Sequence, residues 1–141
     1  NEMEVHIYIG TDSKAPKSCT RKYGYVLECN LRGTPWTKEK FGEAAGTYHS
    51  IVLRALIEAM KRLTKPSEVH IHTEDVYILS MLENNVDNWA ENGYLTSKGE
   101  PVSNADQWRE LHDIAQNHLL LSEPGKHTYT KWMIERMKKD V

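Results

Sequence analysis

Two carboxylates, Asp12 and Glu74, lie where predicted strands end, and a pair of carboxylates there can support metal-dependent chemistry. Asp12 follows the alternating stretch EVHIYIGT, and Glu74 follows the alternating stretch VHIHT. In α/β sheets functional groups gather at the carboxyl ends of strands, so both side chains can contribute to one site. Two carboxylates brought together repel each other unless a proton or a divalent cation lies between them. The alternative is that each acid caps the turn that follows its strand.

Histidines share the strand faces of these acids and widen the range of metals that such a site can hold. Because side chains alternate along a strand, His6 lies on the face of Asp12, and His70 and His72 lie on the face of Glu74. Imidazole combined with carboxylate suits Zn²⁺, Mn²⁺ or Fe²⁺ better than Mg²⁺. The alternative is that these histidines point outward and form hydrogen bonds with their neighbours.

The hydrophobic pattern predicts the elements that position these residues. Further strands are expected in YGYVLECN and WTKEKFGEAAG, and a helix over Tyr48–Leu63, where apolar residues recur at helical spacing. Later helices are expected in VYILSMLEN and in ADQWRELHDIAQNHLLL, the second capped by Asn104, whereas KHTYTKWMIERM fits a strand or a helix. This order predicts an α/β fold, with a mixed sheet, helices on its faces and a parallel strand pair around the Tyr48–Leu63 helix.

Composition limits the class of protein. The 141 residues are enough for one domain over residues 1–141, and the formal net charge of −2 argues against strong non-specific binding to nucleic acid, although a local basic patch is compatible with it. Without a membrane-spanning apolar run or a signal peptide, we expect a soluble cytoplasmic protein with no membrane contact. Cys19 and Cys29 are expected to be free thiols.

Several motifs resemble ribonuclease H of type I over about residues 5–121. They are TD at 11–12, YG at 23–24, TED-x-Y at 73–77 and NWAENGYLTSKGEPVSNADQW at 88–108. The last one is similar to the substrate-binding handle of that family through Trp89, Gly93, Tyr94, Pro101, Val102, Asn104, Asp106 and Trp108. The resemblance implies a ribonuclease H-like fold, with three antiparallel strands and then parallel strands, and an RNA–DNA hybrid as the ligand.

The sequence departs from the family at the catalytic acids. The family holds two Mg²⁺ ions with four carboxylates, and the resemblance implies Asp12 and Glu74 as catalytic and metal-binding residues for Mg²⁺ or Mn²⁺. Glu74 stands where the family has Asp, and Val52 stands where it has Glu. The fourth acid is missing: Lys131 falls near its place if the last residues form the family's final helix. We therefore expect weak metal binding and impaired or absent hydrolysis.

Two alternatives to an impaired nuclease stay open. One is an active hybrid endonuclease with a rebuilt site, in which Asp75, Glu135 or His127 replaces a missing ligand. Asp140 is a further candidate for the fourth acid. The other alternative is a protein-interaction module on the same fold, which the mild acidity and the acidic handle favour over a strong nucleic-acid binder.

Candidate substrate contacts come from three segments. Lys14, Lys17, Arg21 and Lys22 form an expected basic patch beside Asp12, and phosphate binding by such a patch depends on salt. The resemblance places His49 and Ser50 where the family presents amide side chains to its substrate. In the handle the candidates are Trp89, Lys98 and Asn104. The alternatives are a solvated basic loop and a tryptophan that packs in the core.

Overall fold

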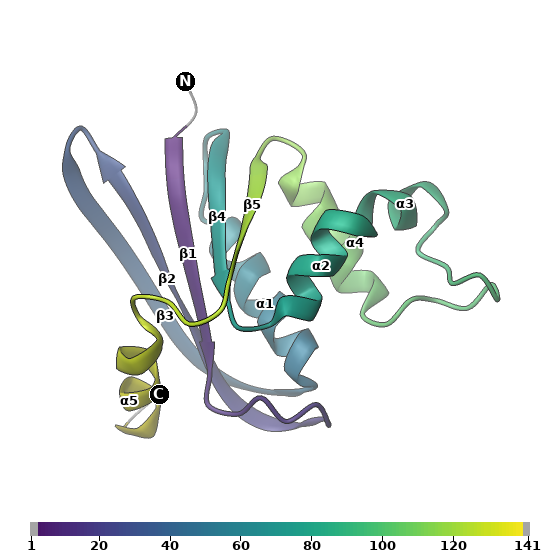
Figure 1. Cartoon of the computed structure of the whole chain (residues 1–141), viewed down its shortest axis with the longest axis horizontal. Helices are drawn as coiled ribbons and strands as arrows, with labels where there is room; N and C mark the ends of the chain where they lie inside the picture. The colour runs from purple at the N-terminus through teal and green to yellow at the C-terminus, as the bar shows by residue number, and fades with distance from the viewer. Residues whose placement is uncertain (1–2, 140–141) are drawn as a thin grey trace.

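The computed structural model describes residues 3–139, which form a five-stranded mixed sheet and five helices (Figure 1). The strands are β1 (Met3–Thr11), β2 (Cys19–Leu31), β3 (Thr34–Gly46), β4 (Ser67–Thr73) and β5 (Leu119–Pro124). The helices are α1 (Tyr48–Met60), α2 (Val76–Asn84), α3 (Val86–Glu91), α4 (Ala105–Ala115) and α5 (Thr130–Lys139). None of the helices within residues 3–139 has the length and apolar character needed to cross a membrane.

The strand order is β3-β2-β1-β4-β5. The β1, β2 and β3 strands pair antiparallel, as tight connections allow, whereas β1–β4 and β4–β5 are parallel pairs reached through helices. This arrangement confirms the mixed α/β sheet expected from the sequence. Because β1, β4 and β5 run parallel, their carboxyl ends lie at the same end of the sheet.

Alternation along β1 and β4 decides which side chains reach the core. Val5, Ile7 and Ile9 on β1 are at most 3% exposed, and Val69 and Ile71 on β4 are at most 1% exposed. They pack with the apolar residues of α1, which Figure 1 shows behind the sheet, and with Trp108 and Leu111 of α4. The residues between them in the sequence therefore point to the opposite face of the sheet.

On the opposite face, α5 lies against β1 and β2, and the loop between β5 and α5 crosses the sheet with His127 and Tyr129 against Tyr8 (Figure 1). A Cβ atom built on Gly10 would lie 3.1 Å from the Met133 sulfur of α5, so the absence of a side chain allows this close approach. His6 and Tyr8 share the face of Gly10 because side chains alternate along β1. The histidines predicted on this face therefore lie on the side of the sheet that α1 does not cover.

The prediction of one helix over residues 105–121 is wrong in its second half. The helix α4 ends at Ala115, and the leucines that follow belong to β5, which pairs with β4 from Glu68↔Leu119 to Thr73↔Pro124. Consecutive leucines suit a helix and a buried strand alike, so local periodicity does not separate the two. The free edge of β4 decides the conformation, because pairing satisfies the backbone groups of both strands.

The remaining ambiguous segments are also defined. The C-terminal stretch is helical over Thr130–Lys139, and Asp140 lies outside the described residues. The polar segment after α2 contains α3 and a short bridge between Leu95 and Pro101. Asn104 does precede α4, but its φ is 61° and its side chain makes no cap hydrogen bond. The capping role predicted for the Asn104 side chain is therefore wrong, and the residue instead provides a left-handed turn, which Asn tolerates well.

Candidate functional site

The carboxyl ends of β1 and β4 and the first turns of α5 surround a hollow of about 610 Å³. Both acids singled out in the sequence line it, together with a third acid from α5 and three lysines. These charged residues are Asp12, Glu74, Glu135, Lys14, Lys126 and Lys131. The structure thus places Asp12 and Glu74 at one site and surrounds them with as many ammonium groups as carboxylates.

Asp12 and Glu74 already have partners from the protein. The Asp12 Oδ1 atom accepts a hydrogen bond from the Lys22 backbone N–H at 3.0 Å, and the Asp12 N–H donates to the Lys22 carbonyl at 3.0 Å. Glu74 Oε1 lies 3.4 Å from the Lys14 ammonium. Asp12 therefore helps to close the loop between β1 and β2, and Lys14 supplies positive charge beside Glu74.

These carboxylates do not fit a two-metal arrangement. Among residues 3–139, the oxygens of Asp12, Glu74 and Glu135 do not all come within 4.8 Å of one another, and Glu135 also pairs with Lys138 at 3.5 Å. Val52, at the position where the family resemblance implies a glutamate, is 1% exposed in the core. The donor set is thus short of oxygens and rich in ammonium groups for two closely spaced divalent ions.

Asp75, a candidate substitute ligand, has a structural role. It is 2% exposed, and its Oδ1 accepts a hydrogen bond from the Ile78 N–H at the start of α2. Its Oδ2 accepts a hydrogen bond from His49 Nδ1 at 2.7 Å. The sequence carried a signal for this role, since an Asp immediately before an apolar helical run is a typical N-cap.

His49 and Ser50 belong to the first turn of α1. The His49 ring lies 4.4 Å from the Tyr77 ring and is held by Asp75, so its orientation is fixed by α2. The Ser50 N–H donates to Thr47 Oγ1, and the Ser50 hydroxyl donates to the Thr47 carbonyl. Neither residue lines the hollow of Asp12 and Glu74. Any substrate contact from this turn therefore lies beside that hollow rather than in it.

The expected basic patch is smaller than the sequence suggested. Arg21 is 1% exposed, and its guanidinium donates to the carbonyls of Ser13 and Lys17 at 2.9 and 2.7 Å. The Lys22 ammonium donates to the Met137 carbonyl near the end of α5. Placing Arg21 in a surface patch is therefore a prediction that the structure corrects, because the guanidinium holds the loop together from inside. Lys14 is exposed and reaches the hollow.

The handle segment presents one exposed lysine and two packed tryptophans. Trp108 is 1% exposed, and the half-buried Trp89 ring meets it edge-on with ring centroids 5.5 Å apart. Lys98 lies in the exposed loop between Leu95 and Pro101. The packing alternative thus describes the contacts of Trp89, while Lys98 keeps its charge available to solvent.

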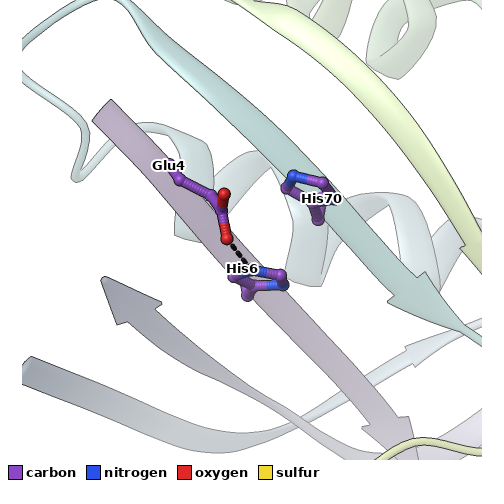
Figure 2. Close-up of side chains that lie close together, drawn as sticks. All are labelled: Glu4, His6 and His70. Carbon is purple, nitrogen blue, oxygen red and sulfur yellow. Dashed lines mark hydrogen bonds and ion pairs between the residues drawn. The ribbon is translucent and has the colours of Figure 1, made fainter. Parts of the chain in front are cut away.

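A second polar group occupies the face of the sheet that α1 does not cover (Figure 2). Glu4 and His6 lie two residues apart on β1, and His70 lies beside them on β4. His6 Nε2 donates to Glu4 Oε2 at 2.8 Å, and His6 Nδ1 shares a hydrogen bond of 2.8 Å with His72 Nε2. The Glu123 and Glu68 carboxylates contact His70, and the Glu123 hydrogen bond is the main cause that raises the pKa of His70.

His127 connects this face to the hollow. Its Nε2–H donates to the Ile9 carbonyl at 2.9 Å, and its Nδ1 accepts a hydrogen bond from the Tyr129 N–H at 3.2 Å. Both ring nitrogens are therefore engaged by the backbone in the neutral form of the imidazole. Burial lowers the pKa of His127 below its ordinary value. His127 is thus poorly placed to replace a missing metal ligand.

Acidification is expected to destabilise the protein through His127. The pKa of His127 is lower in the folded protein than in the unfolded chain, so the unfolded chain takes up a proton first as pH falls. The free energy of unfolding therefore decreases as pH falls below about 6.5, the ordinary pKa of histidine. Urea unfolding at about pH 7.5 and about pH 5.5 measures the loss. The His127→Gln variant should lose less stability over this interval than the unmodified protein. Equal losses would contradict this role of His127.

Comparisons with known proteins agree with the fold. The sequence profile of the family described as RNase H matches residues 3–122. The chain is similar to Ribonuclease H of Neisseria meningitidis serogroup C / serotype 2a, with 38% identity over 82% of this chain and 79% of the relative. It is also similar to Ribonuclease H of Saccharopolyspora erythraea, with 41% identity over 55% of this chain and 50% of the relative. The chain thus spans about half the length of several curated relatives that it matches.

Two solved structures share the fold. LC9-RNase H1, described as a type 1 RNase H with the type 2 active-site motif, superposes with a TM-score of 0.74 at 17% identity, covering 98% of this chain and 70% of the other. A foamy viral protease-reverse transcriptase in complex with an RNA/DNA hybrid superposes with a TM-score of 0.59 at 13% identity, covering 96% of this chain and 19% of the other. At these identities the likeness concerns the fold alone.

Proposed function

Because the chain belongs to the ribonuclease H family, we propose that it binds RNA–DNA hybrids and hydrolyses them weakly or not at all. The weak or absent hydrolysis is proposed from one observation: the Lys14 ammonium lies 3.4 Å from Glu74. The hollow around them is lined by as many lysines as carboxylates. A divalent ion at Glu74 has to displace this ammonium group or bind close to it against electrostatic repulsion. Binding of one Mg²⁺ or Mn²⁺ ion by Asp12 and Glu74 stays a prediction.

Hybrid binding is supported by exposed lysines at the hollow and in the handle loop. A similar fold, the foamy viral reverse transcriptase, has been solved with an RNA/DNA hybrid. In this chain Lys14 and Lys126 border the hollow, and Lys98 lies in the exposed handle loop. Contacts of this kind recognise phosphates, and discrimination of the RNA strand requires further contacts with 2′-hydroxyls in the minor groove. His49 and Ser50 at the start of α1 are the candidates for that role.

Impaired hydrolysis is supported by the positions of the substituted acids. Val52 is enclosed by the core, and Lys131 faces the hollow near the place where the resemblance implies the fourth carboxylate. Two of the four oxygen-donating side chains are therefore replaced, one by an apolar group and one by a cation. Neither replacement can ligate Mg²⁺, which prefers oxygen ligands in octahedral geometry.

A rebuilt nuclease site is the second candidate, and one observation favours it. Glu135 lines the same hollow as Asp12 and Glu74, so a rotated Glu135 side chain can add a third carboxylate. A protein-interaction role on this fold is the outcome left if neither binding nor cleavage is found. The cytoplasmic location expected from the sequence stays a prediction.

Cleavage and binding measured on the same samples test the proposal. A labelled RNA–DNA hybrid is incubated with the protein in Mg²⁺ and in Mn²⁺, with Asp12→Asn as the control for metal-dependent cleavage. Asn retains an Oδ1 acceptor for the Lys22 N–H, so this control should keep the loop intact. We expect salt-sensitive binding and cleavage that is absent or only slightly faster than that of Asp12→Asn. Rapid multiple-turnover cleavage that Asp12→Asn abolishes would instead establish a rebuilt nuclease site.

The salt dependence of binding tests the assigned phosphate contacts. The double variant Lys14→Ala with Lys98→Ala should reduce the slope of log affinity against log salt by about 1 to 2, because each phosphate contact contributes slightly less than one. The matched control is Lys61→Ala with Lys65→Ala, which removes two charges at the opposite end of α1. An unchanged slope in the first variant would assign Lys14 and Lys98 to solvent.

A further inference from the structure

We propose that Glu4, His6 and His70 form a binding site for a divalent transition-metal ion of the Zn²⁺ class on the face of the sheet that α1 does not cover. None of the three lines the hollow of Asp12 and Glu74. They also lie outside the segments that resemble the catalytic and handle motifs. This site therefore does not depend on the proposed hydrolase function.

The register of the sheet brings the three side chains together. Glu4 and His6 point to the same side because they are two residues apart on β1, and His6 lies directly opposite His70 in the parallel pair with β4. Their candidate ligand atoms all lie within 4.8 Å of one another. Figure 2 shows the Glu4 carboxylate and both imidazoles above neighbouring strands. Two rigid strands thus present one carboxylate and two imidazoles, a frequent donor combination for Zn²⁺.

Further side chains form hydrogen bonds with the ring nitrogens of the two histidines. His70 Nδ1 lies 2.9 Å from Glu123 Oε2, and His70 Nε2 lies 2.8 Å from Glu68 Oε1. Whichever nitrogen binds the ion, the other one therefore keeps a carboxylate partner. His6 Nδ1 lies 2.8 Å from His72 Nε2, so His72 is placed to contact Nδ1 when Nε2 binds the ion. Such partners fix the ring orientation and raise the basicity of metal-binding imidazoles.

Charge favours a divalent cation at this place. Three carboxylates surround the two imidazoles, those of Glu4, Glu68 and Glu123. No lysine or arginine forms a salt bridge with these three acids within residues 3–139, in contrast to Glu74 in the hollow. A divalent ion would offset most of this negative charge. Imidazole donors select Zn²⁺ and similar ions over Mg²⁺, which prefers a shell of oxygens.

Binding requires a small rearrangement of the rings. The His6 and His70 rings are stacked, with centroids 4.5 Å apart and planes at 15°, so their lone pairs do not yet converge. Each ring has to rotate about its side-chain bonds and release the proton that now contacts a carboxylate. The Glu4, His6 and His70 side chains are 64%, 24% and 15% exposed, which leaves an approach for the ion. The bound ion would link β1 to β4 and stabilise the folded state.

Calorimetric titration of the metal-stripped protein with Zn²⁺ tests the site. We expect one ion per chain, no comparable binding of Mg²⁺, and a melting temperature that rises with Zn²⁺ concentration. His6→Gln and His70→Gln should each weaken Zn²⁺ binding by at least about 10-fold, and Glu123→Gln should weaken it through His70. Glu4→Gln changes a side chain that is 64% exposed, so this ligand deletion should not disturb packing.

Two controls separate this site from other histidines and from the hollow. His112→Gln removes an imidazole that faces Asp87 on the far side of the molecule, and Asp12→Asn changes the hollow. Both should leave Zn²⁺ affinity unchanged. Absence of Zn²⁺ binding in the unmodified protein, or undiminished binding in His6→Gln, His70→Gln and Glu4→Gln, would overturn the proposal. Loss of binding in Asp12→Asn alone would move the ion to the hollow, which equally overturns it.

Discussion

Val52→Glu is expected to destabilise the protein by about 3 kcal/mol or more and to produce no Mg²⁺-dependent cleavage of a hybrid. The substitution restores the acid that the family resemblance implies at this position. Val52 is 1% exposed among the apolar side chains of α1, β1 and β4, so the new carboxylate would enter the core without a partner. Burial without a counter-charge disfavours the ionised form and raises the pKa of such a carboxyl group.

Urea unfolding measures this loss, and Val52→Gln is the matched control because it has nearly the same shape without the charge. The Glu variant should be less stable than the Gln variant at neutral pH. The gap should narrow as pH falls toward about 4.3, because the folded Glu variant takes up its proton at higher pH than the unfolded chain. A stable Val52→Glu protein that cleaves the hybrid would contradict this expectation. It would show that residue 52 reaches the hollow and that Asp12 and Glu74 need only one further carboxylate for cleavage.

Trp108→Ala is expected to destabilise the protein by about 3–5 kcal/mol, the second large effect. The Trp108 side chain is 1% exposed, and its ring packs against the Trp89 ring with centroids 5.5 Å apart. Truncation therefore leaves a large cavity between α3, α4 and the core. Trp108→Phe retains most of the apolar contact and serves as the control. The matched tryptophans of the handle motif then act through packing rather than through stacking on a nucleic acid.

Hybrid binding by the same variants separates packing from substrate contact. If the tryptophans only pack, binding by Trp108→Phe should equal that of the unmodified protein, and binding by Trp108→Ala should fall only in proportion to its unfolded fraction. Trp89→Ala extends the test to the half-buried ring. A variant that stays folded and loses hybrid affinity would show that the handle tryptophans touch the ligand.

The sequence was informative where one element settles its own conformation. Period-two alternation identified β1 and β4, helical spacing identified α1, and their order implied a parallel pair, as the structure confirms. The strand β5 could not be found in this way, because its leucines continue the apolar pattern of α4. Its conformation depends on hydrogen bonds to β4, which is about fifty residues earlier in the chain. Such a partner is invisible to a local pattern.

The same division applies to the candidate site. The sequence by itself determined that Asp12 and Glu74 lie at strand ends and that His6 and His70 lie on the face opposite the core, because side-chain direction follows from position along a strand. Only the tertiary structure decided that Arg21 is buried. It also decided that Lys14 lies beside Glu74 and that His6 stands opposite His70. These outcomes depend on register and packing between distant segments, and the energies of ionised groups depend on whatever charges those contacts bring near.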